Sequence, residues 1–251
     1  MQKLFQQEVF IHADEMPVNR LTSKDIDFYF FSDFCERIYG KELSLEHASL
    51  DQLLADMNLL REGNLNLACA LLFSKKSQYY LPAFIIKAVA FPGTEITSDT
   101  YLDSRDIAGK LTDIYDQAKS FLRNNTRMEQ KGQSFNSLGI PEIPDIVWEE
   151  LLVNALIHRD YFISAPIRLF IFSDRIEIIS PGHLPNNLTV ENIRRCNSNM
   201  RNPVLASFAA RLLPYRGTGS GILRALKAWP HIQFVDDREG NLFSAIVKRP
   251  A

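Results

Sequence analysis

The sequence predicts an α+β protein in which a mixed β-sheet is layered with helices in the C-terminal half. Two pairs of β-rich runs, at 167–180 and 232–248, are each interrupted by a short turn, as expected for β-hairpins. Apolar residues recur at helical spacing at 24–39 and 104–123. These patterns indicate helices packed on a sheet, preceded by a smaller helical and β-hairpin domain.

Composition limits the class of protein. The 251 residues are 46% hydrophobic and carry a net charge of −2, so a large core is expected without the overall basic excess of many nucleic-acid-binding proteins. The three cysteines are far apart and form no metal-binding spacing, which favours reduced thiols. The N-terminus lacks a signal-peptide pattern and no apolar run is long enough to span a bilayer. We therefore expect a cytoplasmic protein with no membrane contact.

The first domain is expected at 1–128. Its apolar spacing and capping residues predict the following elements: a short strand at 9–11, helices at 24–39, 50–57 and 64–73, and a strand at 83–91. A turn at Pro92-Gly93-Thr94 then suggests that 95–102 returns as the hairpin partner of that strand. Helices followed by a hairpin are also typical of a winged-helix DNA-binding domain, so that alternative stays open.

The second domain is expected at 129–251. A long helix at 104–123 ends the first domain, and the polar stretch 127–139 is the predicted boundary. A helix then starts near Pro144 or Asp145. The remaining predicted elements follow in order: a hairpin at 167–180 with its turn at Ser173-Asp174, helices at 203–211 and 222–229, and a closing hairpin at 232–248.

A polar stripe runs along the helix that contains the segment 149–161. Glu150, Asn154 and His158 follow each other at intervals of four residues, so they share one face of a helix that is otherwise apolar. Such a stripe either faces a ligand cavity or belongs to a half-buried helix whose polar groups meet water. For His158, a hydrogen bond to Asp160 or to a backbone carbonyl is an equally good interpretation.

A glycine-rich segment precedes the helix at 222–229. Gly217, Thr218, Gly219 and Gly221 lie within five residues, and such loops let backbone N–H groups approach an anion at a helix N-terminus. The segment follows no strand and no GxxxxGK[ST] sequence occurs in the chain, which excludes a Walker A loop and a Rossmann fingerprint. Helicase motor motifs are absent.

The order of these motifs resembles the GHKL (Bergerat-fold) nucleotide-binding arrangement. A Glu precedes an Asn by one helical turn, a strand ends in a glycine loop at Gly182, and a Gly-x-Gly-x-Gly loop opens a later helix. In more detail, segments 148–161, 174–182, 201–203 and 217–219 resemble the C-terminal domain of Schlafen/AlbA-type bacterial transcriptional regulators labelled RecG-related. The AlbA-type DNA-binding domain that usually comes first has no counterpart here, so we expect a piece of a longer chain or a shortened member.

This resemblance implies a module that binds ATP and Mg²⁺ and is at most a weak ATPase. Asn154 would contribute an oxygen ligand to Mg²⁺, and Glu150 would orient or deprotonate the attacking water as the catalytic residue. The cofactor-binding set would comprise Asn154, His158, Gly182, Gly217, Thr218, Gly219 and Gly221. The sequence departs from the family where an acid would contact adenine, because Ser180-Pro181-Gly182 stands there.

A non-catalytic role is the alternative. Between 189 and 229 seven basic residues accompany one acid, Glu191. This local positive charge could bind nucleotide phosphates, DNA or an acidic partner, or simply be solvated. In this alternative the protein is a DNA-associated regulatory or homodimerisation module whose nucleotide site is degenerate. DNA would then be bound by the region of Arg194 and Arg195, or by an N-terminal domain that is absent here.

Overall fold

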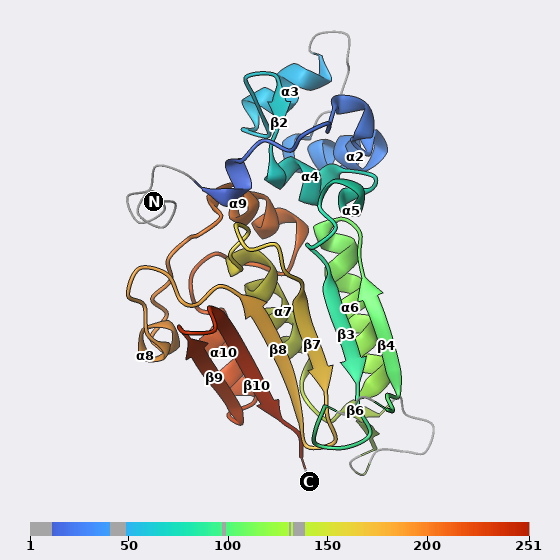
Figure 1. Ribbon diagram of the computed structural model, residues 1–251, viewed down its shortest axis with the longest axis vertical. Coiled ribbons are helices and arrows are strands. Elements are labelled where there is room, and N and C mark those ends of the chain that lie inside the picture. The colour runs from blue at the N-terminus through green and yellow to red at the C-terminus, as the bar shows by residue number, and fades with distance from the viewer. Residues whose placement is uncertain (1–11, 41–48, 97–98, 131, 133–138, 251) are drawn as a thin grey trace.

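A six-stranded mixed sheet organises the computed structural model, which describes residues 12–40, 49–96, 99–130, 132 and 139–250. The strand order is β4-β3-β7-β8-β10-β9 (Figure 1). Its strands are β3 (Ile86–Ala90), β4 (Asp103–Ile107), β7 (Ile167–Ile171), β8 (Arg175–Pro181), β9 (Ile232–Asp237) and β10 (Leu242–Lys248). Neighbouring strands are antiparallel except β3 and β7, which run parallel. The predicted α+β fold class is confirmed.

Helices cover one face of this sheet. Figure 1 shows α6 (Leu111–Asn125), α7 (Asp145–His158) and α10 (Gly221–Ala228) behind the strands. Burial alternates along β7 and β8, as expected when one face packs on helices and the other does not. In α7, nine of the fourteen residues are buried, so this helix is enclosed on most sides. Its polar stripe therefore lies inside the protein and not on an open surface.

A helical cap lies at one end of the sheet (Figure 1). It contains η1 (Ala13–Glu15), η2 (Ser23–Asp25), α2 (Phe28–Tyr39), α3 (Leu50–Asp56), α4 (Leu67–Phe73), α5 (Ser77–Tyr80) and the small β1 (Leu60–Arg61) and β2 (Asn64–Leu65) hairpin. Every residue of α4 is buried. Phe34 of α2, Phe73 of α4 and Phe208 of α9 (Pro203–Leu212) are in mutual ring contact. The cap is thus packed against a helix from the other half of the sequence.

The sheet crosses the predicted boundary at residue 128. Strand β3 precedes that residue, yet it pairs along its length with β7, which follows it. The boundary segment itself contains the short β5 (Met128–Glu129) and β6 (Ile140–Pro141) pair. A division into domains at 1–128 and 129–251 stays a prediction, as does a winged-helix character of the first half. The strand expected at 9–11 lies outside the described residues.

Two predictions for the first half were wrong in part. The helix expected at 64–73 starts only at Leu67, because Asn64 and Leu65 pair with β1 as strand β2. The partner of β3 is β4 and not 95–102, so residues 104–107 are strand where a helix was expected. Gly109 adopts a φ of 137°, which ends any continuous helix, and α6 starts only at Leu111. Asp113 accepts a hydrogen bond from the Lys110 backbone N–H and so fixes this start. Pairing with β3 thus outweighs the local helical pattern of 104–110.

The other predicted elements of the second half are confirmed, including both hairpins and the helices at 203–211 and 222–229. Helix α8 (Val190–Arg194) was not expected; Thr189 and Asn192 cap its first turn reciprocally. None of the helices in the described ranges combines the length and the apolar character that crossing a membrane requires.

Candidate functional site

The predicted site residues surround a single cavity. Its walls come from α7, the end of β8, the chain segment that follows β8, and the loop before α10. All eight residues that sequence reasoning assigned to the site line this cavity: Glu150, Asn154, His158, Gly182, Gly217, Thr218, Gly219 and Gly221. The polar stripe of α7 and the glycine loop, separated by about sixty residues of sequence, therefore face each other across one space.

Glu150 is held in an ion pair. One carboxylate oxygen, Oε1, lies 2.6 Å from Nη2 of Arg224 on α10, and the Glu150 side chain is only 5% exposed. Burial raises the pKa of Glu150, while the positive charge of Arg224 opposes this rise. A carboxylate engaged with an arginine is a weaker base than a free one, so the pair limits the capacity of Glu150 to take a proton.

Asn154 is oriented by its own helix. Its amide nitrogen Nδ2 donates a 2.6 Å hydrogen bond to the Glu150 carbonyl oxygen, one turn earlier. The carbonyl oxygen Oδ1 is therefore the group that Asn154 can offer a ligand or a hard cation. The stripe consequently presents one fixed neutral oxygen beside one neutralised carboxylate.

His158 contacts Tyr215 and forms a hydrogen bond with the backbone of Asn199, as the alternative of a backbone partner predicted. The Tyr215 hydroxyl lies 3.5 Å from Nε2 of His158, and the two rings meet edge to face. Burial, reinforced by the positive charge of Arg201, lowers the pKa of His158 to about 4. The ring is therefore neutral at physiological pH and contributes a hydrogen-bonding group without charge to the cavity.

Close approach requires glycine at several points of the wall. A β-carbon on Gly182 would lie 2.5 Å from the Cβ of Asp160 and 2.6 Å from Nη1 of Arg201. At Gly219, where φ is 71°, a β-carbon would lie 2.5 Å from the backbone oxygen of Cys196. At Gly221 it would lie 2.3 Å from Oε2 of Glu150. A side chain at these positions would thus meet the Asp160 and Arg201 side chains, the Cys196 backbone or the Glu150 carboxylate.

The cavity has an excess of positive charge. Arg201, Arg216 and Arg224 line it, whereas Glu150 is the only acid among the described lining residues. The basic excess at 189–229 is visible in the sequence, but the sequence does not distinguish these three arginines as members of the site. Arg194 and Arg195 do not belong to the lining and are exposed. Three cations opposite one carboxylate favour an anionic ligand.

Much of the remaining cavity lining is apolar. The apolar lining residues are Leu151, Ala155, Ile178, Leu184, Leu188, Ile193, Phe234, Phe243 and Ala245. Ser180, where a family acid would stand, is buried and donates its hydroxyl to the Ala155 carbonyl oxygen over 3.3 Å. The cavity therefore combines apolar side chains, which suit a ring system, with arginines and glycines, which suit an anion.

Within the described parts of the chain, no group of three or more His, Cys, Asp or Glu side chains is arranged to hold a metal ion.

Comparisons with known proteins concern the C-terminal half of the chain and the fold. The family model described as "Putative ATP-dependent DNA helicase recG C-terminal" matches residues 164–238, a range that starts after α7 and includes the glycine loop. This match supports a GHKL-like ATPase-type domain in the C-terminal half. A comparison with curated proteins finds no significant match.

A solved structure shares the fold. The crystal structure of the DIP2311 protein from Corynebacterium diphtheriae superposes with a TM-score of 0.67 at 21% sequence identity. The similarity covers 99% of this chain and 50% of that protein, so the present chain spans half its length. At this identity the likeness concerns the fold alone.

Proposed function

We propose that the cavity binds a magnesium–nucleoside triphosphate complex, with ATP as the expected ligand. The observation that carries this proposal is the meeting, in one cavity, of three arginines, a glycine loop and the Asn154 stripe around an apolar pocket. Arginine guanidinium groups and backbone N–H groups in glycine loops are the donors that phosphate oxygens prefer. The family match over 164–238 points to the same class of ligand.

Different residues of the cavity would bind different parts of the ligand. The loop at 217–221 and Arg216 would bind the phosphates, and the apolar side chains would contact the base. Asn154 would contribute its Oδ1 to Mg²⁺, which prefers oxygen ligands and keeps several waters. When bound, the ion would neutralise phosphate charge. Neutral His158 would line the cavity without adding charge.

Hydrolysis at this site would be slow. Glu150 is the residue we assign to orient the attacking water, yet Arg224 occupies its Oε1 at 2.6 Å. A productive water would have to use Oε2 or displace the arginine. We therefore propose a nucleotide-binding protein that is at most a weak ATPase, and whose role as a Schlafen/AlbA-type transcriptional regulator rests on its sequence resemblance.

Replacing Asn154 by alanine tests the proposal directly. The variant should bind ATP at least about tenfold more weakly in the presence of Mg²⁺, because an oriented oxygen ligand is lost. Calorimetry with and without Mg²⁺ measures the effect. Asn154→Asp, which retains an oxygen ligand, should keep the Mg²⁺ dependence, and Asn64→Ala, at the exposed position of β2, is the control. Absence of ATP binding to the wild-type protein at millimolar concentration would refute the proposal.

A non-catalytic, DNA-associated module or homodimer is the second candidate. Its support is the exposure of Arg194 and Arg195 at the end of α8, outside the cavity lining. Exposed arginines that do not serve the cavity are available for the phosphate backbone of DNA. This function would be compatible with an occupied nucleotide cavity, since the two arginines lie outside it.

A further inference from the structure

A strap of chain, residues 182–188, leaves β8 and contributes both polar backbone and apolar side chains to the cavity lining. Gly182, His183, Leu184, Pro185 and Leu188 all belong to the lining. The strap has no regular secondary structure apart from turns. Its shape must therefore be fixed by contacts to other elements.

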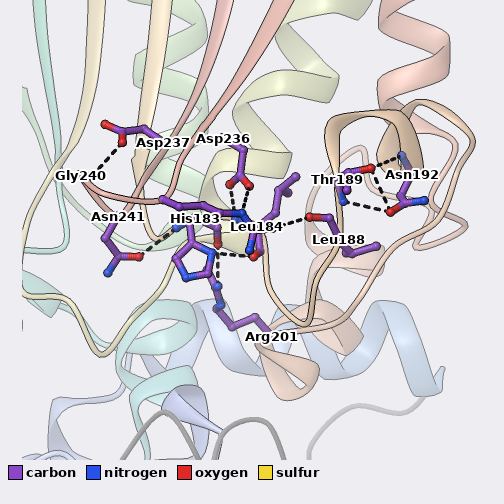
Figure 2. A network of polar contacts seen from close by, with 11 residues as sticks. His183, Leu184, Leu188, Thr189, Asn192, Arg201, Asp236, Asp237, Gly240 and Asn241 are labelled. Atoms are coloured by element: carbon purple, nitrogen blue, oxygen red, sulfur yellow. Dashed lines mark hydrogen bonds and ion pairs between the residues drawn. The ribbon is translucent and has the colours of Figure 1, made fainter.

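Two residues of the β9–β10 hairpin, Asp236 in β9 and Asn241 in the turn, supply contacts to the strap. The Gly182 N–H donates to the Asn241 backbone oxygen over 2.8 Å, and the His183 N–H donates to Oδ1 of Asn241 over 3.2 Å. The Leu184 N–H donates to Oδ1 of Asp236 over 2.7 Å. Figure 2 shows the Asp236 and Asn241 side chains directed at the strap. Three consecutive backbone donors of the strap are thus bound by two residues.

Two arginines hold the same strap by its carbonyl groups. Arg238 donates from Nη2 to the Leu188 oxygen over 2.9 Å and is itself paired, through Nε, with Asp236 over the same distance. Arg201 donates to the His183 oxygen over 2.8 Å and to the His158 oxygen over 3.3 Å, so it ties the strap to the end of α7. The strap is therefore held at both ends, at residues 182–184 and at Leu188.

We propose that Asp236 and Asn241 are positioning residues for the part of the cavity that receives the base. Neither belongs to the cavity lining, so both act on a ligand only through the strap. The strap N–H groups that they bind are engaged within the protein. Leu184, Pro185 and Leu188 are then presented as a preformed apolar wall, which lowers the ordering cost of binding a ring system. This inference rests on the proposed function, because it assigns the strap to the base and not to the phosphates.

The hairpin allows a matched set of variants. Asp236→Ala removes the acceptor of the Leu184 N–H. Asn241→Gly removes the acceptor of the His183 N–H but keeps the backbone oxygen and tolerates the φ of 52° at this position. Asn241→Asp retains a side-chain oxygen and is the conservative variant. Glu239→Ala removes an exposed carboxylate from the same turn and is the control.

Calorimetric titration of the full chain with Mg-ATP and, separately, with Mg-tripolyphosphate distinguishes base binding from phosphate binding. Asp236→Ala and Asn241→Gly should each weaken ATP binding about tenfold, whereas Asn241→Asp and Glu239→Ala should stay near the wild type. Tripolyphosphate should bind all variants equally, because the loop at 217–221 and Arg216 are untouched.

The outcomes separate this inference from the proposed function. Unchanged ATP affinity in Asp236→Ala and Asn241→Gly would overturn the positioning role while leaving nucleotide binding intact. An equal loss of ATP and tripolyphosphate affinity, accompanied by a lower melting temperature, would also overturn it, because it would indicate general destabilisation. A wild-type protein that binds neither probe would refute the proposed function, and the inference with it.

Discussion

Gly219→Ala is expected to abolish measurable nucleotide binding, whereas Gly217→Ala should retain most of it. Both glycines have left-handed φ angles, 71° and 66°, so an alanine costs about 1–2 kcal/mol of backbone strain at either position. The two positions differ in the room available for a β-carbon. A β-carbon at Gly219 would meet the Cys196 backbone oxygen at 2.5 Å, but at Gly217 its nearest neighbour is Cε1 of Tyr215 at 3.7 Å.

The contact at Gly219 cannot be relieved by moving a side chain, because the obstacle is backbone. The loop at 217–221 must therefore shift away from Cys196, and its N–H groups lose the geometry that phosphate binding requires. Calorimetry with Mg-ATP and circular dichroism, applied to both variants, separate loss of binding from loss of fold. Gly63→Ala, with a φ of 77° and open space around its β-carbon, controls for strain alone. Equal ATP affinity in the Gly217 and Gly219 variants would show that the loop does not bind the ligand.

Local sequence patterns predicted most elements because their physical causes are local. The Ser173-Asp174 turn, the Pro-led start of α7 and the closing hairpin depend on residues near each other in the chain. The strand β4 was missed because its pairing with β3 is a tertiary interaction that residues 103–107 alone do not encode. The sheet order, with β3 beside β7, likewise depends on contacts between distant residues.

The same distinction between local and tertiary causes applies to the site. Glu150, Asn154 and the glycine loop were predictable, because helical spacing and glycine clustering are visible in the sequence. The ion pair of Glu150 with Arg224 was not predictable, since the sequence does not show which of the seven basic side chains at 189–229 contacts Glu150. Nor could the sequence reveal that Asp236 and Asn241 hold the strap. These contacts depend on how α10 and the β9–β10 hairpin pack against the rest.

Removing Arg224 should leave the Glu150 carboxylate buried without a cation. Arg224→Met is expected to lower the free energy of unfolding by about 3 kcal/mol near neutral pH, at the lower end for broken buried pairs because Arg224 is partly exposed. In a Glu150→Gln background the same substitution should cost much less. The difference, a coupling energy of about 1–3 kcal/mol, measures the pair itself. Lys227→Met, an exposed cation on the same helix, should change little in either background.

The pH dependence of this loss follows from the direction of the pKa shift. Burial already raises the pKa of Glu150 above its ordinary value of 4.5, and losing Arg224 should raise it further. A group whose pKa is raised by folding stabilises the native state below its unfolded pKa, and this contribution disappears as the pH rises through the folded pKa. Urea denaturation should therefore show a small cost of Arg224→Met at about pH 4 and a larger one at about pH 8, where the carboxylate is charged. In the Glu150→Gln background, the cost of Arg224→Met should not vary with pH. A pH-independent loss that is equal in both backgrounds would mean that Arg224 stabilises α10 by packing alone, and Glu150 would then be free to act on a bound water.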